Sequence, residues 1–305
     1  MANGTTGEPV TGPFSAGSTR TVLAAACAQA GLDATGAVLL RLGENALYRL
    51  AQAPVVVRIA RTMDYWDDVT QEVQVARWLA GHQFPAAQAC DVTQPIRAAG
   101  HPVTFWRYIE GQPGTLDDAE SMAVLLRRLH SLPAPTEFAL KPTDVLDRVR
   151  PRIEAATVPT GDKDFLLDRW AQICAELARL KFPLSPGPTH GDAHTENLIV
   201  QDGDAVLIDF ERFSWGQPEW DLALPATEYL TAGWWGEVEY RRFVDSYGYD
   251  VTTWSGFPVL RAAHEVKMTT WLMQNVGEST EIAREFDVRV RTIRTGRAER
   301  TWQAF

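Results

Sequence analysis

Residues 190–209 read HGDAHTENLIVQDGDAVLID. Two short apolar runs flank a polar segment that contains Asp-Gly, and this pattern is typical of a β-hairpin. If Val200 pairs with Ala205, the second strand returns Asp209 to the side of Asn197. The sequence therefore predicts a hairpin with polar side chains gathered at its open end.

Oxygen-bearing side chains dominate that end of the hairpin. Asp192 lies on the loop just before it, so two carboxylates and one carboxamide converge there. Such oxygen ligands suit Mg²⁺, which usually takes one or two protein carboxylates together with substrate phosphates. The remaining carboxylate could accept a proton from a hydroxyl nucleophile, which predicts a phosphoryl-transfer site. The alternative is a hairpin whose polar ends are only solvated loops.

The order of these residues resembles a known catalytic loop. His190, Gly191 and Asp192, followed five residues later by Asn197, resemble the catalytic loop of the aminoglycoside phosphotransferase family, a branch of the protein-kinase-like fold. The resemblance implies an α+β fold with two lobes, a small β-rich N-terminal lobe and a larger, mainly helical C-terminal lobe. It also implies ATP or GTP as co-substrate, together with Mg²⁺.

A second segment supports the same resemblance. Ile208 and Asp209 resemble the metal-binding segment of that family, although Glu211 stands where protein kinases carry glycine. Gly216 and the Asp-Leu-Ala sequence at residues 221–223 also match.

The resemblance assigns a role to each of these polar residues. Asp192 is the expected catalytic base, or the carboxylate that orients the nucleophile. Asn197 and Asp209 are expected to hold the Mg²⁺ that bridges the nucleotide phosphates. His190 and Asp221 are expected to be structural. The residue that matches His190 in this fold braces the loop, and Asp221, which opens an apolar helical stretch, is expected to cap a helix or to tie the loop.

Arg58 is an isolated charge in an otherwise apolar strand predicted over residues 55–60. The helical stretch 68–80 places Glu72 on the same side as its apolar residues, so the two opposite charges are expected to pair. In the resembled fold a lysine at this strand position holds the nucleotide phosphates. Arg58 would take that role with a different geometry, and a salt bridge that only stabilises the lobe is the alternative.

Two further segments are assigned to the nucleotide through the resemblance. The apolar pattern over residues 38–50 predicts a hairpin, which in this fold covers the nucleotide phosphates, so Gly43 and Asn45 are expected near them. A later strand-like run ends at the expected hinge, where a purine would bond to backbone groups near Arg107 and Ile109.

These segments divide the chain into three parts. Residues 1–18 lack the pattern of a signal peptide and are expected to form a flexible leader. Residues 19–107 form the expected nucleotide-binding lobe and residues 108–305 the catalytic and acceptor-binding lobe. The expected helices include residues 19–31, 220–231, 237–247, 260–274 and 279–294.

Composition narrows the range of partners. The net charge of −10 argues against nucleic acid. Residues 108–283 carry 28 acidic and 15 basic side chains, which would attract a cationic acceptor; a solvated acidic surface is the alternative. No run of eighteen apolar residues indicates a membrane span, and three widely spaced cysteines favour the reducing cytoplasm.

The leading functional hypothesis is an O-phosphotransferase that uses ATP or GTP with Mg²⁺ on a small hydroxylated molecule. An aminoglycoside-like antibiotic is one candidate acceptor, with antibiotic resistance as the implied role. A metabolite kinase of the choline, homoserine or methylthioribose type is the alternative, and a non-catalytic nucleotide-binding pseudokinase is the alternative from another class. Candidates for acceptor recognition are four glutamates and three tryptophans: Glu211, Glu219, Glu228, Glu265, Trp234, Trp235 and Trp271.

Overall fold

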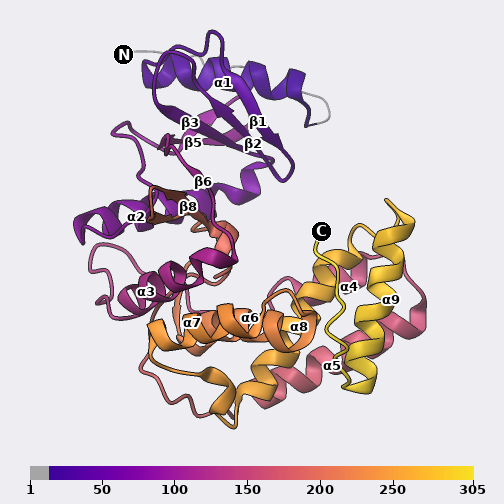
Figure 1. Cartoon of the computed structure of the whole chain (residues 1–305). Helices are drawn as coiled ribbons and strands as arrows, with labels where there is room; N and C mark the ends of the chain where they lie inside the picture. The colour runs from indigo at the N-terminus through magenta and orange to yellow at the C-terminus, as the bar shows by residue number, and fades with distance from the viewer. Residues whose placement is uncertain (1–13) are drawn as a thin grey trace. The chain divides into compact units, whose positions relative to one another are not determined.

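Two compact units make up the chain in the computed structural model, which describes residues 14–305 (Figure 1). The first unit holds the described residues up to Pro113 together with Leu198–Glu211, and the second holds Gly114–Asn197 together with Arg212–Phe305. The first unit is built on an antiparallel sheet, whereas the second is mainly helical.

A five-stranded antiparallel sheet forms the centre of the first unit. Its strands follow one another in the order β1 (Val38–Leu42), β2 (Asn45–Arg49), β3 (Val55–Ala60), β5 (His101–Arg107) and β4 (Ile96–Ala98). The hairpin expected over residues 38–50 and the strand expected over residues 55–60 are both present.

Helix α1 (Ala16–Ala30) packs on this sheet and closes a hydrophobic core. Val22 and Leu23 of the helix are buried in one cluster with Val57 and Phe105 of the sheet. The helix begins before the expected residue 19 because Ser15 caps it: the Ser15 hydroxyl accepts from the Ser18 amide at 3.3 Å. The predicted leader is therefore shorter than 18 residues at its helical end, and its residues 1–13 lie outside the described residues.

Helix α2 (Trp66–Gly81) follows a 3₁₀ turn at Met63–Tyr65. Its buried stripe includes Val69, Val73 and Leu79, and Glu72 is buried on the same side. This is the amphipathic pattern expected for the stretch 68–80, with one carboxylate among the apolar residues.

The hairpin of β8 (Leu198–Gln201) and β9 (Asp204–Leu207) has the register expected from the sequence, with Leu198 opposite Leu207 and Val200 opposite Ala205. It belongs to the first unit, whereas the sequence analysis includes it in the lobe 108–305. The reason is backbone pairing: β6 (Gln112–Pro113) pairs with β8, and the Leu207 amide donates to the Pro85 carbonyl at 3.0 Å.

Seven α-helices lie among the described residues of the second unit. They are α3 (Ala119–His130), α4 (Val149–Ala155), α5 (Thr160–Leu177), α6 (Glu219–Thr227), α7 (Glu237–Tyr247), α8 (Phe257–Met273) and α9 (Thr280–Thr295). A π-helical turn at Glu228–Ala232 continues α6, and 3₁₀ turns lie at Leu116–Asp118, Thr195–Asn197 and Val251–Thr253.

Helix α8 lies at the centre of this unit (Figure 1). It packs against α4, α5, α6 and α9, while α3 packs against α7. A two-stranded sheet, β7 (Gly187–Thr189) with β10 (Ser214–Gly216), leads into and away from the segment that carries Asp192. Within residues 14–305, no helix has the length and apolar character needed to cross a bilayer.

A substitution at Gly111 tests how closely the chain packs against the β8–β9 hairpin. Its φ is +137°, and a β-carbon there would lie 2.6 Å from the Val200 carbonyl oxygen. We therefore expect Gly111→Ala to lower the free energy of unfolding by about 1–3 kcal/mol. Gly81→Ala is the control, because the space around Gly81 is open and alanine favours a helix. Urea unfolding curves that coincide for Gly111→Ala and wild type would contradict this account.

Candidate active site

The segment that carries Asp192 is a tight loop between β7 and a 3₁₀ turn. Gly191 has φ of +80°, and any β-carbon on it would collide with the Arg212 carbonyl oxygen. Glycine is required here for both reasons. Arg212 is itself held in place, since its guanidinium contacts both carboxylate oxygens of Asp147 at 2.6 and 3.0 Å.

Asp221 holds this loop through hydrogen bonds to its backbone. Its side chain is buried and accepts from the amides of His190 and Gly191, each at 2.7 Å. The same carboxylate contacts His130 Nε2 at 2.9 Å, and His130 Nδ1 contacts the Tyr247 hydroxyl at 2.9 Å. The expected tie between Asp221 and the loop is confirmed, and it extends through His130 to helices α3 and α7.

These bonds determine the ionisation of Asp221. Burial opposes the charged form of Asp221, but the bond from His130, the electrostatic interactions with His130 and His190, and the Gly191 amide outweigh it, so the pKa of Asp221 lies below its usual range. The carboxylate therefore stays ionised and keeps both loop amides paired at neutral pH.

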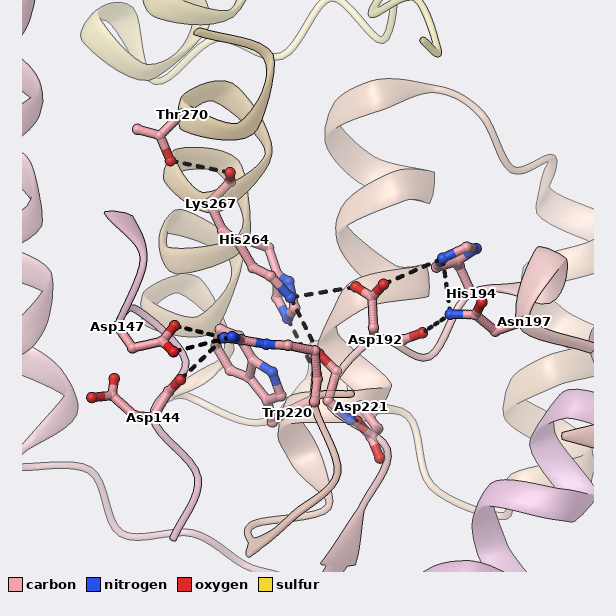
Figure 2. A network of polar contacts seen from close by, with 12 residues as sticks. Asp144, Asp147, Asp192, His194, Asn197, Trp220, Asp221, His264, Lys267 and Thr270 are labelled. Atoms are coloured by element: carbon pink, nitrogen blue, oxygen red, sulfur yellow. Dashed lines mark hydrogen bonds and ion pairs between the residues drawn. The ribbon is translucent and has the colours of Figure 1, made fainter. Parts of the chain in front are cut away.

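Asp192 projects from this loop between two nitrogen-bearing side chains (Figure 2). Lys267 Nζ lies 3.4 Å from Asp192 Oδ1, and His194 Nε2 lies 3.4 Å from Oδ2. The Asp192 side chain remains 42% exposed, so a substrate hydroxyl can reach it. Desolvation raises the pKa of Asp192, but Lys267 first and His194 second more than offset it, and the pKa lies far below its usual range.

Asn197 is oriented by the same loop. Its Nδ2 donates to the Asp192 carbonyl at 2.8 Å and contacts His194 Nε2 at 3.0 Å. Because the amide nitrogen makes both contacts, Oδ1 is directed away from them and can serve as an oxygen ligand. The structure thus brings the Asn197 side chain to the backbone of Asp192, and the roles of both residues toward a metal and a substrate stay predictions.

Arg58 lies at the centre of a charged cluster in the first unit. It pairs with Glu72 and, at 3.3 Å, with Glu211. The Asn45 amide oxygen, turned toward the guanidinium, accepts from its Nη2 at 2.9 Å and its Nε at 3.2 Å. The expected pairing of Arg58 with Glu72 is confirmed, and these side chains line a small cavity together with Glu44, Tyr65, Asp68 and Val69.

Negative charge exceeds positive charge in this cluster. Burial, opposed by Arg58 and reinforced by Asp209 and Glu211, raises the pKa of Glu72 to about 7. Three carboxylates thus act on one guanidinium, which leaves a surplus of negative charge that a cation could neutralise.

Asp209 is one of the carboxylates that act on Arg58, and its backbone is strained. Its φ is +64°, a region that is uncommon for residues other than glycine. Strain of this kind is kept where the position of a side chain matters. Its carboxylate is a hard oxygen donor of the kind that Mg²⁺ takes, and the Asn197 amide oxygen is a donor of the same kind. In the described part of the chain, no three His, Cys, Asp or Glu side chains group into a self-contained metal site.

Gly43, Arg107 and Ile109 are the remaining residues predicted to contact the nucleotide, and backbone groups of two of them are already hydrogen-bonded within the fold. The Gly43 carbonyl accepts from Arg61 Nη2 at 2.8 Å, which anchors the turn of the β1–β2 hairpin. The Arg107 amide donates to the Gln88 carbonyl at 2.8 Å, so that donor is already used by the fold. Ile109 is half-buried. The roles of Gly43, Arg107 and Ile109 toward a nucleotide stay predictions.

The four candidate acceptor glutamates differ in what they bind. Glu211 pairs with Arg58, Glu219 accepts from the Leu184 amide at 2.7 Å, and Glu265 bonds to Arg261 and Thr231. Glu228 lies in the π-helical turn and accepts from the Trp235 indole at 2.8 Å.

Burial raises the pKa of Glu228 to about 7, against the opposing charge of His194. Of the three candidate tryptophans, Trp235 is buried, Trp234 is bonded to the Trp302 carbonyl and Trp271 is 38% exposed.

Comparison with known proteins places the chain in a family. The sequence profile of the phosphotransferase enzyme family matches residues 39–262, and this span includes Arg58, Asp192, Asn197 and Asp209. The chain belongs to the phosphotransferase enzyme family. The resemblance drawn from residues 190–197 is confirmed.

Among curated family members, an aminoglycoside 3′-phosphotransferase of Escherichia coli is 33% identical over 171 residues, 52% of this chain and 62% of that protein. The aligned segment therefore spans less than two thirds of the relative.

Solved structures confirm the expected two-lobed, protein-kinase-like fold of this family. An amicoumacin kinase, solved with AMP-PNP, Ca²⁺ and Ami, superposes with a TM-score of 0.69 at 14% identity, covering 86% of this chain and 89% of its own. A choline/ethanolamine kinase family protein from Mesorhizobium loti gives 0.61 at 18% identity, covering 91% and 92%. At these identities the likeness concerns the fold.

Lys267 is a residue of this site that no pattern in the sequence predicted. It lies 75 positions after Asp192 on α8, and only the packing of that helix brings it to the loop. The sequence held one indication of its role: Lys267 is the single lysine of the largely buried helix Phe257–Met273. An ionised side chain in such a helix needs a partner.

Removing the Asp221 carboxylate should destabilise the protein. Asp221→Asn leaves one loop amide facing an NH₂ group, so we expect the free energy of unfolding at pH 7 to fall by about 3–5 kcal/mol. The folded-state pKa of Asp221 is lowered, so its stabilisation is present above the unfolded pKa of about 4 and is lost as the pH falls further. The difference between variant and wild type should therefore narrow in acid.

Denaturant unfolding at several pH values measures this effect. Asp287→Asn, on the exposed face of α9, is the control and should stay within about 0.5 kcal/mol of wild type. Equal stability of Asp221→Asn and wild type at pH 7 would show that the loop does not depend on this carboxylate.

Arg58→Ala separates a phosphate contact from a structural salt bridge. If Arg58 binds phosphate, the Kd for AMP-PNP measured by calorimetry should rise about tenfold or more. Arg58→Lys, which keeps the charge but not the fork of donors, should lie in between. Arg77→Ala, on the same helix as Glu72, is the control. A lowered melting temperature with unchanged Kd would favour the structural reading.

Proposed function

We propose that this chain transfers the terminal phosphoryl group of ATP or GTP to a hydroxyl group of a small molecule, with Mg²⁺. The observation that carries the proposal is the Asp192 loop: a partly exposed, ionised carboxylate on a loop clamped by Asp221, with Asn197 bonded to the Asp192 carbonyl. Family membership supports the same reaction. Catalysis of phosphoryl transfer is largely positioning and charge neutralisation, and these residues are suited to both.

Each residue has a definite part in this reaction. Asp192 accepts the hydrogen bond of the acceptor hydroxyl and directs its oxygen toward the phosphorus atom. A bond forms between that oxygen and phosphorus, the bond to the bridging oxygen of the nucleotide breaks, and the hydroxyl proton passes to Asp192. Because the pKa of Asp192 is low, this carboxylate orients the hydroxyl throughout and takes the proton late.

The nucleotide is assigned mainly to the first unit. Arg58 would neutralise phosphate oxygens, with Glu72 and Asn45 holding its guanidinium in place. Asn197 and Asp209 would hold Mg²⁺, which neutralises the phosphate charge when bound. Asn197 directly precedes β8, and Asp209 follows the end of β9 by two residues. Gly43, Arg107 and Ile109 are proposed as further nucleotide contacts.

An aminoglycoside-like antibiotic is the first candidate acceptor. The Escherichia coli relative, an aminoglycoside 3′-phosphotransferase, supports it. The acidic surplus of residues 108–283 would attract a polycation, and the buried carboxylate of Glu228 could bind an amino group. A choline-type metabolite kinase is the second candidate, because the choline/ethanolamine kinase family protein shares the fold. We further propose a cytoplasmic location, since the cysteines are free, and no nucleic acid partner.

Asp192→Asn tests the proposal. In the presence of Mg²⁺ and ATP or GTP, wild type should release ADP or GDP in response to one acceptor in a panel of kanamycin, choline, homoserine and methylthioribose. Asp192→Asn should lose most of this turnover, by about 10²–10⁴-fold, while its Kd for AMP-PNP stays unchanged.

Asp202→Asn, in the exposed turn of the β8–β9 hairpin, is the matched control and should keep wild-type turnover. Acceptor-dependent turnover that is equal in Asp192→Asn and wild type would contradict the role of Asp192. Nucleotide binding without turnover by wild type on any acceptor would favour the pseudokinase alternative.

A further inference from the structure

Lys267 approaches the catalytic loop from helix α8 (Figure 2). Its ammonium donates to the Gly191 carbonyl at 3.2 Å and to Asp192 Oδ1 at 3.4 Å. One cation thus bridges the backbone of one residue and the carboxylate of the next. This geometry restricts the rotation of the Asp192 side chain about its first side-chain torsion.

The direction of the Lys267 side chain is set by its neighbours on α6 and α8. His264, one turn earlier, stacks on the Trp220 ring at 4.1 Å between centroids, and its Nε2 contacts the Trp220 carbonyl at 3.2 Å. The Lys267 ammonium lies 5.9 Å from the same ring. Burial and the nearby Lys267 lower the pKa of His264 to about 3, so that imidazole is neutral and leaves the charge to Lys267.

His194 is a partner of Asp192 in only one of its protonation states, unlike Lys267. Its Nε2 lies 3.4 Å from the Asp192 carboxylate but 3.0 Å from the Asn197 amide nitrogen. One ring nitrogen either donates a hydrogen bond or accepts one. Because the Asn197 nitrogen is a donor, Nε2 accepts from Asn197 when it carries no hydrogen and donates to Asp192 only when it carries one. An ammonium has donors only, so Lys267 serves Asp192 in either state of His194.

We propose that Lys267 is a positioning residue that holds the Asp192 carboxylate in the orientation required by the acceptor hydroxyl. This inference rests on the proposed phosphoryl transfer for its kinetic part and on the loop geometry for its structural part. Lys267 touches Asp192 and Gly191, and it acts through them.

A merely structural lysine would behave differently on substitution. The Lys267 side chain is 17% exposed and the Asp192 side chain 42%, so water can solvate the carboxylate once its partner is gone. A methionine fills the space of the lysine stem without the cost of burying a charge. Lys267→Met should therefore keep the melting temperature near that of wild type while it releases Asp192.

Steady-state kinetics with kanamycin and ATP test the kinetic part. We expect Lys267→Met to lower kcat about 10²-fold, as loss of one preorganised donor commonly does, with the KM for ATP within about twofold. Lys267→Arg keeps the charge and should recover most of the loss. Lys163→Met, at a half-buried lysine of α5 that bonds to the Glu154 carbonyl, is the matched control. Wild-type kcat in Lys267→Met would overturn the proposal.

Crystal structures of wild type and Lys267→Met test the structural part without any turnover. Asp192 should keep one rotamer beside Lys267 in wild type and adopt another rotamer, or several, in the variant. A single unchanged Asp192 rotamer in the variant would overturn the proposal even if the enzyme is active. Absence of turnover by wild type on every acceptor, with Asp192 released in the variant, would instead reject the proposed function and leave the positioning role intact.

Discussion

The buried carboxylate of Asp221 is the constraint on which the catalytic loop depends. It accepts hydrogen bonds from the amides of His190 and Gly191. Burying a carboxylate is unfavourable unless hydrogen bonds offset the loss of its hydration. Here three donors converge on one side chain. The third, His130, carries the same constraint to Tyr247 and so to the packing of α3 on α7. The position of Asp192 thus follows from the helical core of its own unit.

The charged clusters of the two units differ in which charge is surrounded by opposite charges. In the first, one guanidinium faces Glu72, Glu211 and Asp209, and the surplus negative charge suits a cation. In the second, the Asp192 carboxylate faces the Lys267 ammonium and the His194 ring, and these contacts hold its pKa below the usual range. Phosphoryl transfer needs both conditions, because a metal must neutralise phosphate while a carboxylate directs the hydroxyl.

Local patterns in the sequence predicted much of this, and long-range packing accounts for the rest. The register of the β8–β9 hairpin follows from a period of two and a turn signal. The pairing of Arg58 with Glu72 follows from two lone charges on apolar faces. Lys267 could not be placed in this way, since a helix pattern shows which face is buried but not which loop it meets. Likewise, the clamp of Arg212 on Asp147 joins two irregular segments that have no periodicity.

The central claim is that a phosphoryl group moves from nucleotide to a small hydroxyl compound. Phosphorus NMR of the protein with Mg²⁺, ATP or GTP, and each acceptor of the panel follows that transfer directly. The account predicts a new phosphomonoester resonance that grows as the γ-phosphate resonance declines and the nucleoside diphosphate appears. Release of inorganic phosphate alone, or unchanged nucleotide with every acceptor, would contradict it.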